Sequence, residues 1–163
     1  MFAMLLAGTL LSSQCSLPPY ASEYRFSDFA AAVQVITQPA TPKLTTPEAR
    51  LYRTQIRRAA KNPPDFSGHL RVAVWGCGTC CGDFAIIDLL SGYVWPSPFG
   101  VTCGPDESRF GGQVGLYYCP ESKLFVVIGS KNDSEVAGAY YYLWDGKGLR
   151  LLKAVEDRNS ATP

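Results

Sequence analysis

The arrangement of apolar and polar residues changes twice along the chain. An uncharged apolar run occupies residues 1–11, a Pro/Thr-rich stretch and a helical pattern follow, and from residue 69 apolar residues recur at every second position. A period of two is typical of β-strands. This pattern predicts strands at 69–75, 83–89, 92–95, 113–118, 124–129, 138–144 and 148–153.

The predicted strands are joined by short turns. Ser91-Gly92 and Asp145-Gly146 are two-residue hairpin signals, and residues 120–123 form a longer turn. Strands such as 138–144 are apolar on both faces, unlike a sheet with one solvated face. We therefore expect a mainly β (α+β) fold, an antiparallel β-meander in a partly curled sheet or sandwich. Its second face would be covered by the sheet itself, the N-terminal segment or another molecule.

A single amphipathic helix is predicted over residues 47–61, packed on the sheet. Thr45 or Thr46 is the expected N-cap, Pro47 suits the first turn, and residues 62–64 (Asn-Pro-Pro) end the helix. The apolar stripe that would face the sheet consists of Tyr52, Ile56, Ala59 and Ala60.

A second face of this helix is basic and is formed by Arg50, Arg53, Arg57 and Lys61. Such a stripe can bind phosphate or an acidic partner. The whole chain, however, carries 15 Lys and Arg against 14 Asp and Glu, a formal net charge of +1. That balance gives no overall attraction to nucleic acid or to anionic membranes. We interpret the stripe as a solvated face and predict no nucleic-acid partner.

The N-terminal apolar run is typical of a secretory signal peptide and is too short to span a bilayer. We expect residues 1–21 to be a leader, followed by an extended connector (22–47), one β-rich domain (48–155) and a tail (156–163). The alternative is a buried N-terminal element of the domain. The prediction is an exported bacterial protein, periplasmic or extracellular, without a transmembrane span in its mature chain. Cleavage near Ala21 or lipid attachment at Cys15 are the two alternatives for processing.

Six cysteines are present, and disulfides are their usual fate in an exported protein. Cys103 and Cys119 are candidates for a bridge that closes the long loop between them. Cys80 and Cys81 are adjacent and cannot easily share one bridge, so each has a different partner or one is free. An even set of thiols requires that Cys15 be retained.

Cys77 and Cys80 form a C-x-x-C motif, which raises a thiol-oxidoreductase alternative. That chemistry needs a helix N-terminus to lower the thiol pKa, whereas here a strand follows. His69 is the only histidine, so a thiol- or His-dependent enzyme would use His69 with Cys80 or Cys77. A zinc site from these residues is a third alternative, but paired C-x-x-C spacing is missing. We predict no metal and no cofactor.

Three stretches resemble a group of small exported bacterial proteins of uncharacterised function: residues 53–61, 62–81 and 84–94. The group is expected to carry an F-x-G-H pattern ahead of W-G-C-G-T-x-C. The matching residues are Phe66, Gly68, His69, Trp75, Cys77 and Cys81, with Cys80 where a glycine is usual. The resemblance implies a Cys77–Cys81 bridge and leaves Cys80 as the odd thiol. It implies no activity.

The absence of a recognisable catalytic motif favours a non-catalytic binding module, of an inhibitor or immunity type, whose partner is another protein. Strands that are apolar on both faces leave a surface for that partner. The predicted binding residues are the clustered aromatic side chains Tyr140, Tyr142 and Trp144.

Overall fold

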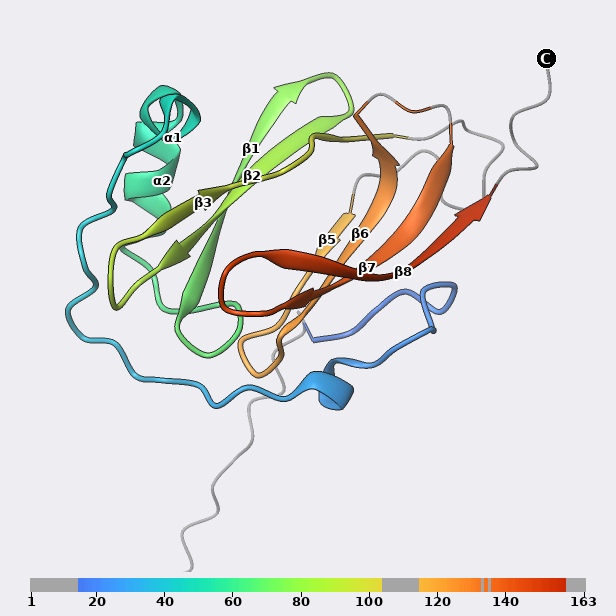
Figure 1. Ribbon diagram of the computed structural model, residues 1–163, viewed down its shortest axis with the longest axis horizontal. Coiled ribbons are helices and arrows are strands. Elements are labelled where there is room, and N and C mark those ends of the chain that lie inside the picture. Colours follow the sequence, from blue (N-terminus) through green and yellow to red (C-terminus); the bar gives the residue numbers. More distant parts are fainter. Residues whose placement is uncertain (1–14, 104–114, 133, 135, 158–163) are drawn as a thin grey trace, which may run out of the picture.

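The computed structural model describes residues 15–103, 115–132, 134 and 136–157. They form one eight-stranded antiparallel sheet with a few short helices (Figure 1), which confirms the mainly β prediction. The strands are β1 (Leu70–Gly78), β2 (Cys81–Asp88), β3 (Val94–Pro96), β4 (Val101–Thr102), β5 (Gly115–Tyr117), β6 (Leu124–Lys131), β7 (Ala137–Trp144) and β8 (Leu149–Asp157). The helices are the 3₁₀ helix η1 (Phe26–Phe29), α1 (Pro47–Leu51) and α2 (Arg53–Ala59).

The sheet consists of two halves that one very short strand joins. β1, β2 and β3 pair in sequence order, and so do β5, β6, β7 and β8. Between them, the two residues of β4 pair with β2 on one side and β6 on the other. The strand order begins with β1 and ends with β8, and the sheet is not closed. β4 was not predicted, because two residues carry no periodicity.

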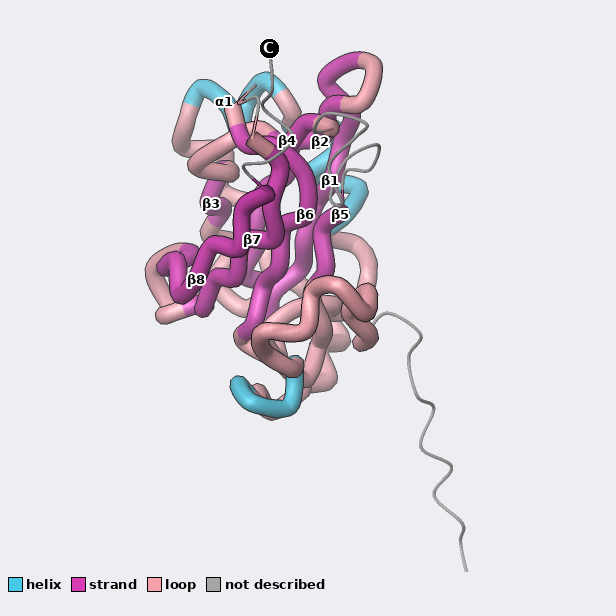
Figure 2. The backbone as a smooth tube through the Cα atoms, turned by 90° about the vertical axis from the view of Figure 1, so that its right-hand side faces the viewer, coloured by secondary structure: helices cyan, strands magenta, loops and turns pink. Residues whose placement is uncertain are grey.

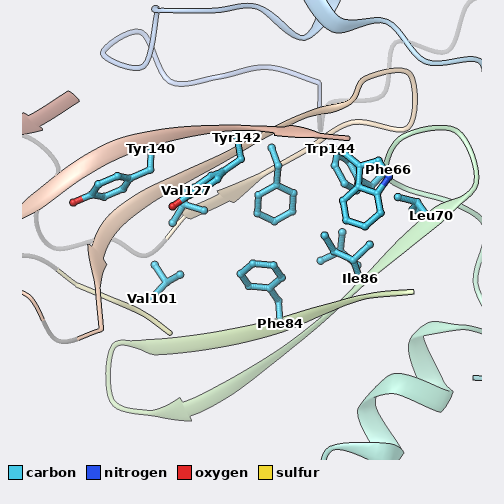
Figure 3. Close-up of a cluster of buried hydrophobic side chains, with 11 residues drawn as sticks. Phe66, Leu70, Phe84, Ile86, Val101, Val127, Tyr140, Tyr142 and Trp144 are labelled. Carbon is cyan, nitrogen blue, oxygen red and sulfur yellow. The ribbon is translucent and has the colours of Figure 1, made fainter. Parts of the chain in front are cut away.

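The two halves face each other across a cluster that we call the inner core. Figure 3 shows Phe84 and Ile86 of β2 pointing toward Tyr142 and Trp144 of β7. Phe66 is fully buried and makes edge-on ring contacts, including one to Trp144 at 6.2 Å between centroids. The buried residues of the inner core are Phe66, Leu70, Val72, Phe84, Ile86, Val101, Phe125, Val127, Tyr140, Tyr142 and Trp144.

Each half of the sheet has an outer face, on the side away from the inner core, and residues that precede β1 cover both of these faces. α1 and α2 pack Ala49 and Ile56 against the outer face of β1 and β2. Residues 15–29 pack Ala21 and Phe26 against the outer face of β6 and β7. The apolar residues on the outer face of each half are therefore covered by the chain itself.

The single helix expected over 47–61 is corrected to two shorter ones, α1 and α2. Tyr52 lies between them, and its backbone (φ −99°, ψ 23°) departs from helical geometry. Its ring stacks on Trp75 of β1, with 4.3 Å between centroids, so the break coincides with a packing contact. Thr46 is the N-cap, and its Oγ1 accepts a hydrogen bond from the Ala49 N–H at 3.1 Å.

Residues 15–46 form an extended segment, the strap, which crosses the end of the sheet opposite β4 (Figures 1 and 2). Its backbone is bonded to both halves. The Ala31 N–H donates to the Glu121 carbonyl at 2.7 Å in the turn before β6. The Ala40 N–H donates to the Leu89 carbonyl at 2.8 Å, just after β2. The strap therefore holds the two halves together.

The turn before β1 also docks directly on the turn before β6. The Ser67 N–H donates to the Ser122 carbonyl at 3.1 Å, and the Gly68 N–H donates to the Pro120 carbonyl at 2.7 Å. We call this the turn contact. It lies at the opposite end of the sheet from β4, so the two halves are joined at both ends.

Gly68 can be no other residue without strain. Its φ is +83°, and a Cβ on its backbone would lie 2.2 Å from the carbonyl oxygen of Ala32 in the strap. Only a residue without a side chain lets the strap approach so closely. The close approach of the strap therefore explains why the F-x-G-H pattern has glycine at position 68.

Replacing Gly68 by alanine is expected to destabilise the protein by more than about 2 kcal/mol, because the positive φ and the clash with Ala32 both oppose a Cβ. Gly146→Ala is the matched control. Gly146 has a φ of +92° with nothing within 4 Å of a Cβ, so about 1 kcal/mol is expected there. Urea unfolding of the oxidised proteins measures both losses, and equal losses would contradict the role of the strap.

Candidate functional site

The structure separates His69 from the cysteines that could share a reaction with it. His69 immediately precedes β1, whereas Cys77 lies near the far end of that strand and Cys80 in the turn after it. At roughly 3.3 Å per residue, His69 and Cys77 are about 25 Å apart. That separation is too large for a shared proton or a shared zinc ion.

His69 lies instead beside the turn between β2 and β3. Its Nε2 is 3.8 Å from Oδ1 of Asp88. The Asp88 carboxylate accepts hydrogen bonds from the Leu90 N–H at 2.8 Å and the Ser91 hydroxyl at 2.6 Å. This carboxylate caps a turn, and His69 contacts it from the start of β1.

All six cysteines are in disulfides, which confirms their predicted use. The bridges are Cys15–Cys119, Cys77–Cys81 and Cys80–Cys103, with Cα–Cα distances of 5.1, 5.1 and 5.4 Å. Cys77–Cys81 is the bridge that the resemblance implied. The expected Cys103–Cys119 bridge is wrong, and Cys80 is not an odd thiol.

β4 explains why Cys103 pairs with Cys80. Thr102 of β4 is opposite Cys81 in β2, which places the next residue, Cys103, beside Cys80. The Cys103 N–H donates to the Cys80 carbonyl at 3.0 Å. The bridge thus reinforces the strand that joins the two halves. The sequence could not reveal this pairing, because β4 itself was not visible in the pattern.

Cys15–Cys119 fastens the beginning of the strap to the turn before β6. The bridge closes a sequence separation of 104 residues. In the chain-entropy model a loop of this length contributes about 4.7 kcal/mol. A lipid thioether at Cys15 would need the sulfur that here binds Cys119. Removal of residues 1–21 would delete this bridge.

One group of metal-ligating side chains lies close together among the described residues: Cys15, Cys119 and Glu121, whose ligand atoms are within 4.8 Å of one another. Both sulfurs are joined to each other in the disulfide. They are therefore not thiolates, the form of cysteine that binds metals.

The three aromatic residues predicted to form a binding surface are buried. Tyr140, Tyr142 and Trp144 point inward from β7 and are 2%, 5% and 5% exposed. This corrects the prediction, and the reason is the bend of the sheet. The alternation along β7 could not show that β2 and β3 lie over these side chains.

Lys131 lies at the edge of the inner core, among aromatic rings. Its ammonium is 3.9 Å from the ring centroid of Tyr140 and 5.5 Å from that of Phe99, and it donates to the Tyr142 hydroxyl at 3.1 Å. Burial lowers the pKa of Lys131, while Glu156 opposes that shift. The ring faces attract the ammonium and favour its charged form. Lys131 therefore connects β6 to β7.

The inner face of the sheet has an uncovered margin at β3 and β8, which we call the apolar fringe. Leu149 and Leu151 of β8 are opposite Trp144 and Tyr142, so they lie on the same inner face. Trp95 of β3 contacts Trp144 at 4.9 Å between centroids, which places β3 over β7 and leaves β8 beyond its edge. The fringe consists of Tyr93, Trp95, Leu149 and Leu151, of which Tyr93 is 45% and Leu151 is 47% exposed.

Asp65 is the buried carboxylate beside the turn contact. Its Oδ1 accepts a hydrogen bond from the Val72 N–H at 2.8 Å, and its Oδ2 is 3.1 Å from the Arg71 guanidinium. Burial raises the pKa of Asp65 to about 6, although the Val72 hydrogen bond and Arg71 both act to lower it. Nearby, burial and the charge of Asp65 raise the pKa of Tyr118 to about 12.

No family model, no curated protein and no solved structure matches this chain.

The disulfide pairing predicts that the native, air-oxidised protein has no thiol that reacts with iodoacetamide. Its mass is expected to be six hydrogens below that of the reduced chain, since each bridge removes two. Intact-mass measurement after alkylation in denaturant, without reductant, checks this. One alkylated cysteine would contradict the pairing and would support a thiol enzyme.

Asp65 predicts a pH-dependent stability. Because its folded-state pKa of about 6 lies above the ordinary value of 3.8, its contribution is present below pH 3.8 and is lost as the pH rises through 6. Above pH 7 the free energy of unfolding is therefore lower by about 3 kcal/mol than below pH 3.8, at 1.36 kcal/mol per pKa unit. Asp65→Asn is expected to lack this slope. Urea midpoints between pH 4 and 8 measure the difference, and parallel curves for both proteins would refute it.

Proposed function

We propose that this protein is an exported, non-catalytic binding module of the inhibitor or immunity type, and that it binds another protein through the apolar fringe. The observation that carries the proposal is the exposed margin of the inner face. The outer faces are covered by the chain itself, whereas Tyr93 and Leu151 remain about half exposed.

The chemistry of the fringe suits a protein partner. Its two aromatic residues, Tyr93 and Trp95, are 4.4 Å apart between ring centroids. Aromatic residues are enriched in protein interfaces and supply much of their binding energy. β8 is also the last strand in the sheet order. A strand in this position can pair with an extended segment of a partner, whose apolar side chains would cover Leu149 and Leu151.

The disulfides support export. Three bridges in one small domain are typical of oxidising compartments and rare in the cytosol. Residues 1–14 of the predicted leader (1–21) lie outside the described part of the chain, whereas residues 15–21 belong to the strap, with Cys15 in a disulfide and Ala21 buried. Among the described residues, none of the helices has the length and hydropathy needed to cross a membrane.

The non-catalytic assignment is supported by where the candidate catalytic groups lie. A thiol enzyme needs a thiolate, and Cys77 and Cys80 are both in disulfides. A His-dependent enzyme needs a nucleophile beside its histidine. His69 contacts the Asp88 carboxylate, which accepts hydrogen bonds from the Leu90 N–H and the Ser91 hydroxyl. Among the described residues, no hydrogen bond joins the His69 imidazole to a Ser, Thr or Cys side chain.

The proposal predicts that a photo-crosslinking residue at position 151 forms an adduct with one protein in the exporting cell. The same residue at position 35 is the control, because Val35 is 93% exposed but lies on the strap and not on β3 or β8. With the captured protein purified, Leu151→Asp is expected to weaken binding at least about tenfold, as for a central interface residue.

Val35→Asp introduces the same charge at an exposed apolar position and should leave the affinity within about twofold. Far-ultraviolet circular dichroism and thermal unfolding show that both variants are folded. If both substitutions weaken binding equally, or if position 151 gives no adduct, the fringe is not the binding surface.

A further inference from the structure

The two helices concentrate positive charge at one place on a nearly neutral protein. Residues 50–61 contain no acidic residue, α1 and α2 together carry one, the exposed Glu48, and the chain as a whole has a net charge of only +1. All five basic side chains of this segment are exposed. We call them the basic face: Arg50, Arg53, Arg57, Arg58 and Lys61.

Helix stability does not explain this arrangement. Arg53 is the first residue of α2, where a positive charge opposes the helix dipole. Arg53 and Arg57 are also four residues apart, a spacing at which like charges repel on a helix. Arg57 and Arg58 lie in the last turn of α2, and Arg50 lies in the last turn of α1, where a positive charge is favourable for the dipole. The placement of Arg53, four residues before Arg57, therefore costs helix stability.

Intramolecular ion pairs do not offset that cost. The ion pairs shown by the described residues involve His69, Arg71 and Lys153, none of which lies on α1 or α2. Arg50 is held in place by backbone carbonyls, through hydrogen bonds of 3.2 Å to Leu44 and 2.8 Å to Thr45. Among the described residues, no ion pair occupies the basic face, so its charges are available to a ligand outside the chain.

The basic face is presented rigidly and has an apolar neighbour. Ile56 and Ala49 are buried against the sheet, which fixes the helices and turns their other sides to solvent. Leu51, next to Arg50, is 69% exposed. Exposed leucine beside clustered arginine and lysine is the chemistry that binds the headgroup region of an anionic membrane.

We propose that the basic face binds peripherally to an anionic phospholipid bilayer. This revises the interpretation of the stripe as a merely solvated face. A phosphate backbone of nucleic acid would attract the same charges, but it would gain nothing from Leu51. The apolar fringe lies on the inner face at β3 and β8, whereas the helices cover the outer face of β1 and β2. A membrane and a protein partner therefore bind different surfaces.

The test uses the full oxidised protein and vesicles of phosphatidylcholine with or without 30% phosphatidylglycerol, as about 30% anionic lipid makes a strongly charged surface. Co-sedimentation at low ionic strength is expected with the anionic vesicles only, and raised salt should abolish it. The double variant Arg53→Gln, Arg57→Gln should lower the partition coefficient about 30-fold, at about 1 kcal/mol per basic residue. Leu51→Ser should lower it several-fold at low ionic strength.

The matched control is Lys147→Gln, Arg150→Gln, which removes two exposed charges at the β7–β8 turn. It should change partitioning by less than about twofold. The Arg53 and Arg57 substitutions relieve repulsion, so thermal unfolding should show an equal or higher midpoint. No binding to anionic vesicles, equal loss in both double variants, or salt-sensitive binding to a duplex oligonucleotide but not to vesicles would overturn the proposal.

Discussion

The turn contact is the interaction on which the rest of this structure depends. The two halves of the sheet share only the two residues of β4 at one end. At the other end they are held by the Ser67 and Gly68 N–H groups on carbonyls of the turn before β6. Because the contact brings these turns together, Phe66 is enclosed between the halves and the inner core becomes continuous. Without it, only the strap and the packing of side chains in the inner core would hold the halves together at that end.

The strap also holds the two halves of the sheet together through close contacts between backbone atoms. It passes over Gly68 at one point and over Gly92 at another, where a Cβ would lie 2.2 Å from the Thr41 carbonyl oxygen. Both contacts are made by backbone against backbone. They explain why a segment rich in proline and threonine, which forms no strand of the sheet, is nevertheless an integral part of the fold.

The strands and turns depend on local chemistry and could be predicted from the sequence. The features that depend on contacts between distant segments could not. Period-two alternation identified the segments that became β1, β2, β6, β7 and β8, and the cap at Thr46 was visible in the sequence. β4 was missed because its two residues form a strand only through their neighbours. The burial of Tyr142 and Trp144 was missed because it depends on the bend of the sheet. The Cys80–Cys103 bridge was not predicted either, because it lies beside β4.

The disulfide connectivity has a consequence for biosynthesis. The cysteines leave the ribosome in chain order, and the partner of Cys15 follows it by 104 residues. Joining each cysteine to the next one available would give Cys15–Cys77 and Cys80–Cys81, neither of which is native. The Cys77–Cys81 and Cys80–Cys103 bridges also interleave, since Cys80 lies between the members of the first pair. Formation of the native set therefore requires either delayed oxidation until the strands have paired or an isomerase that exchanges early bridges.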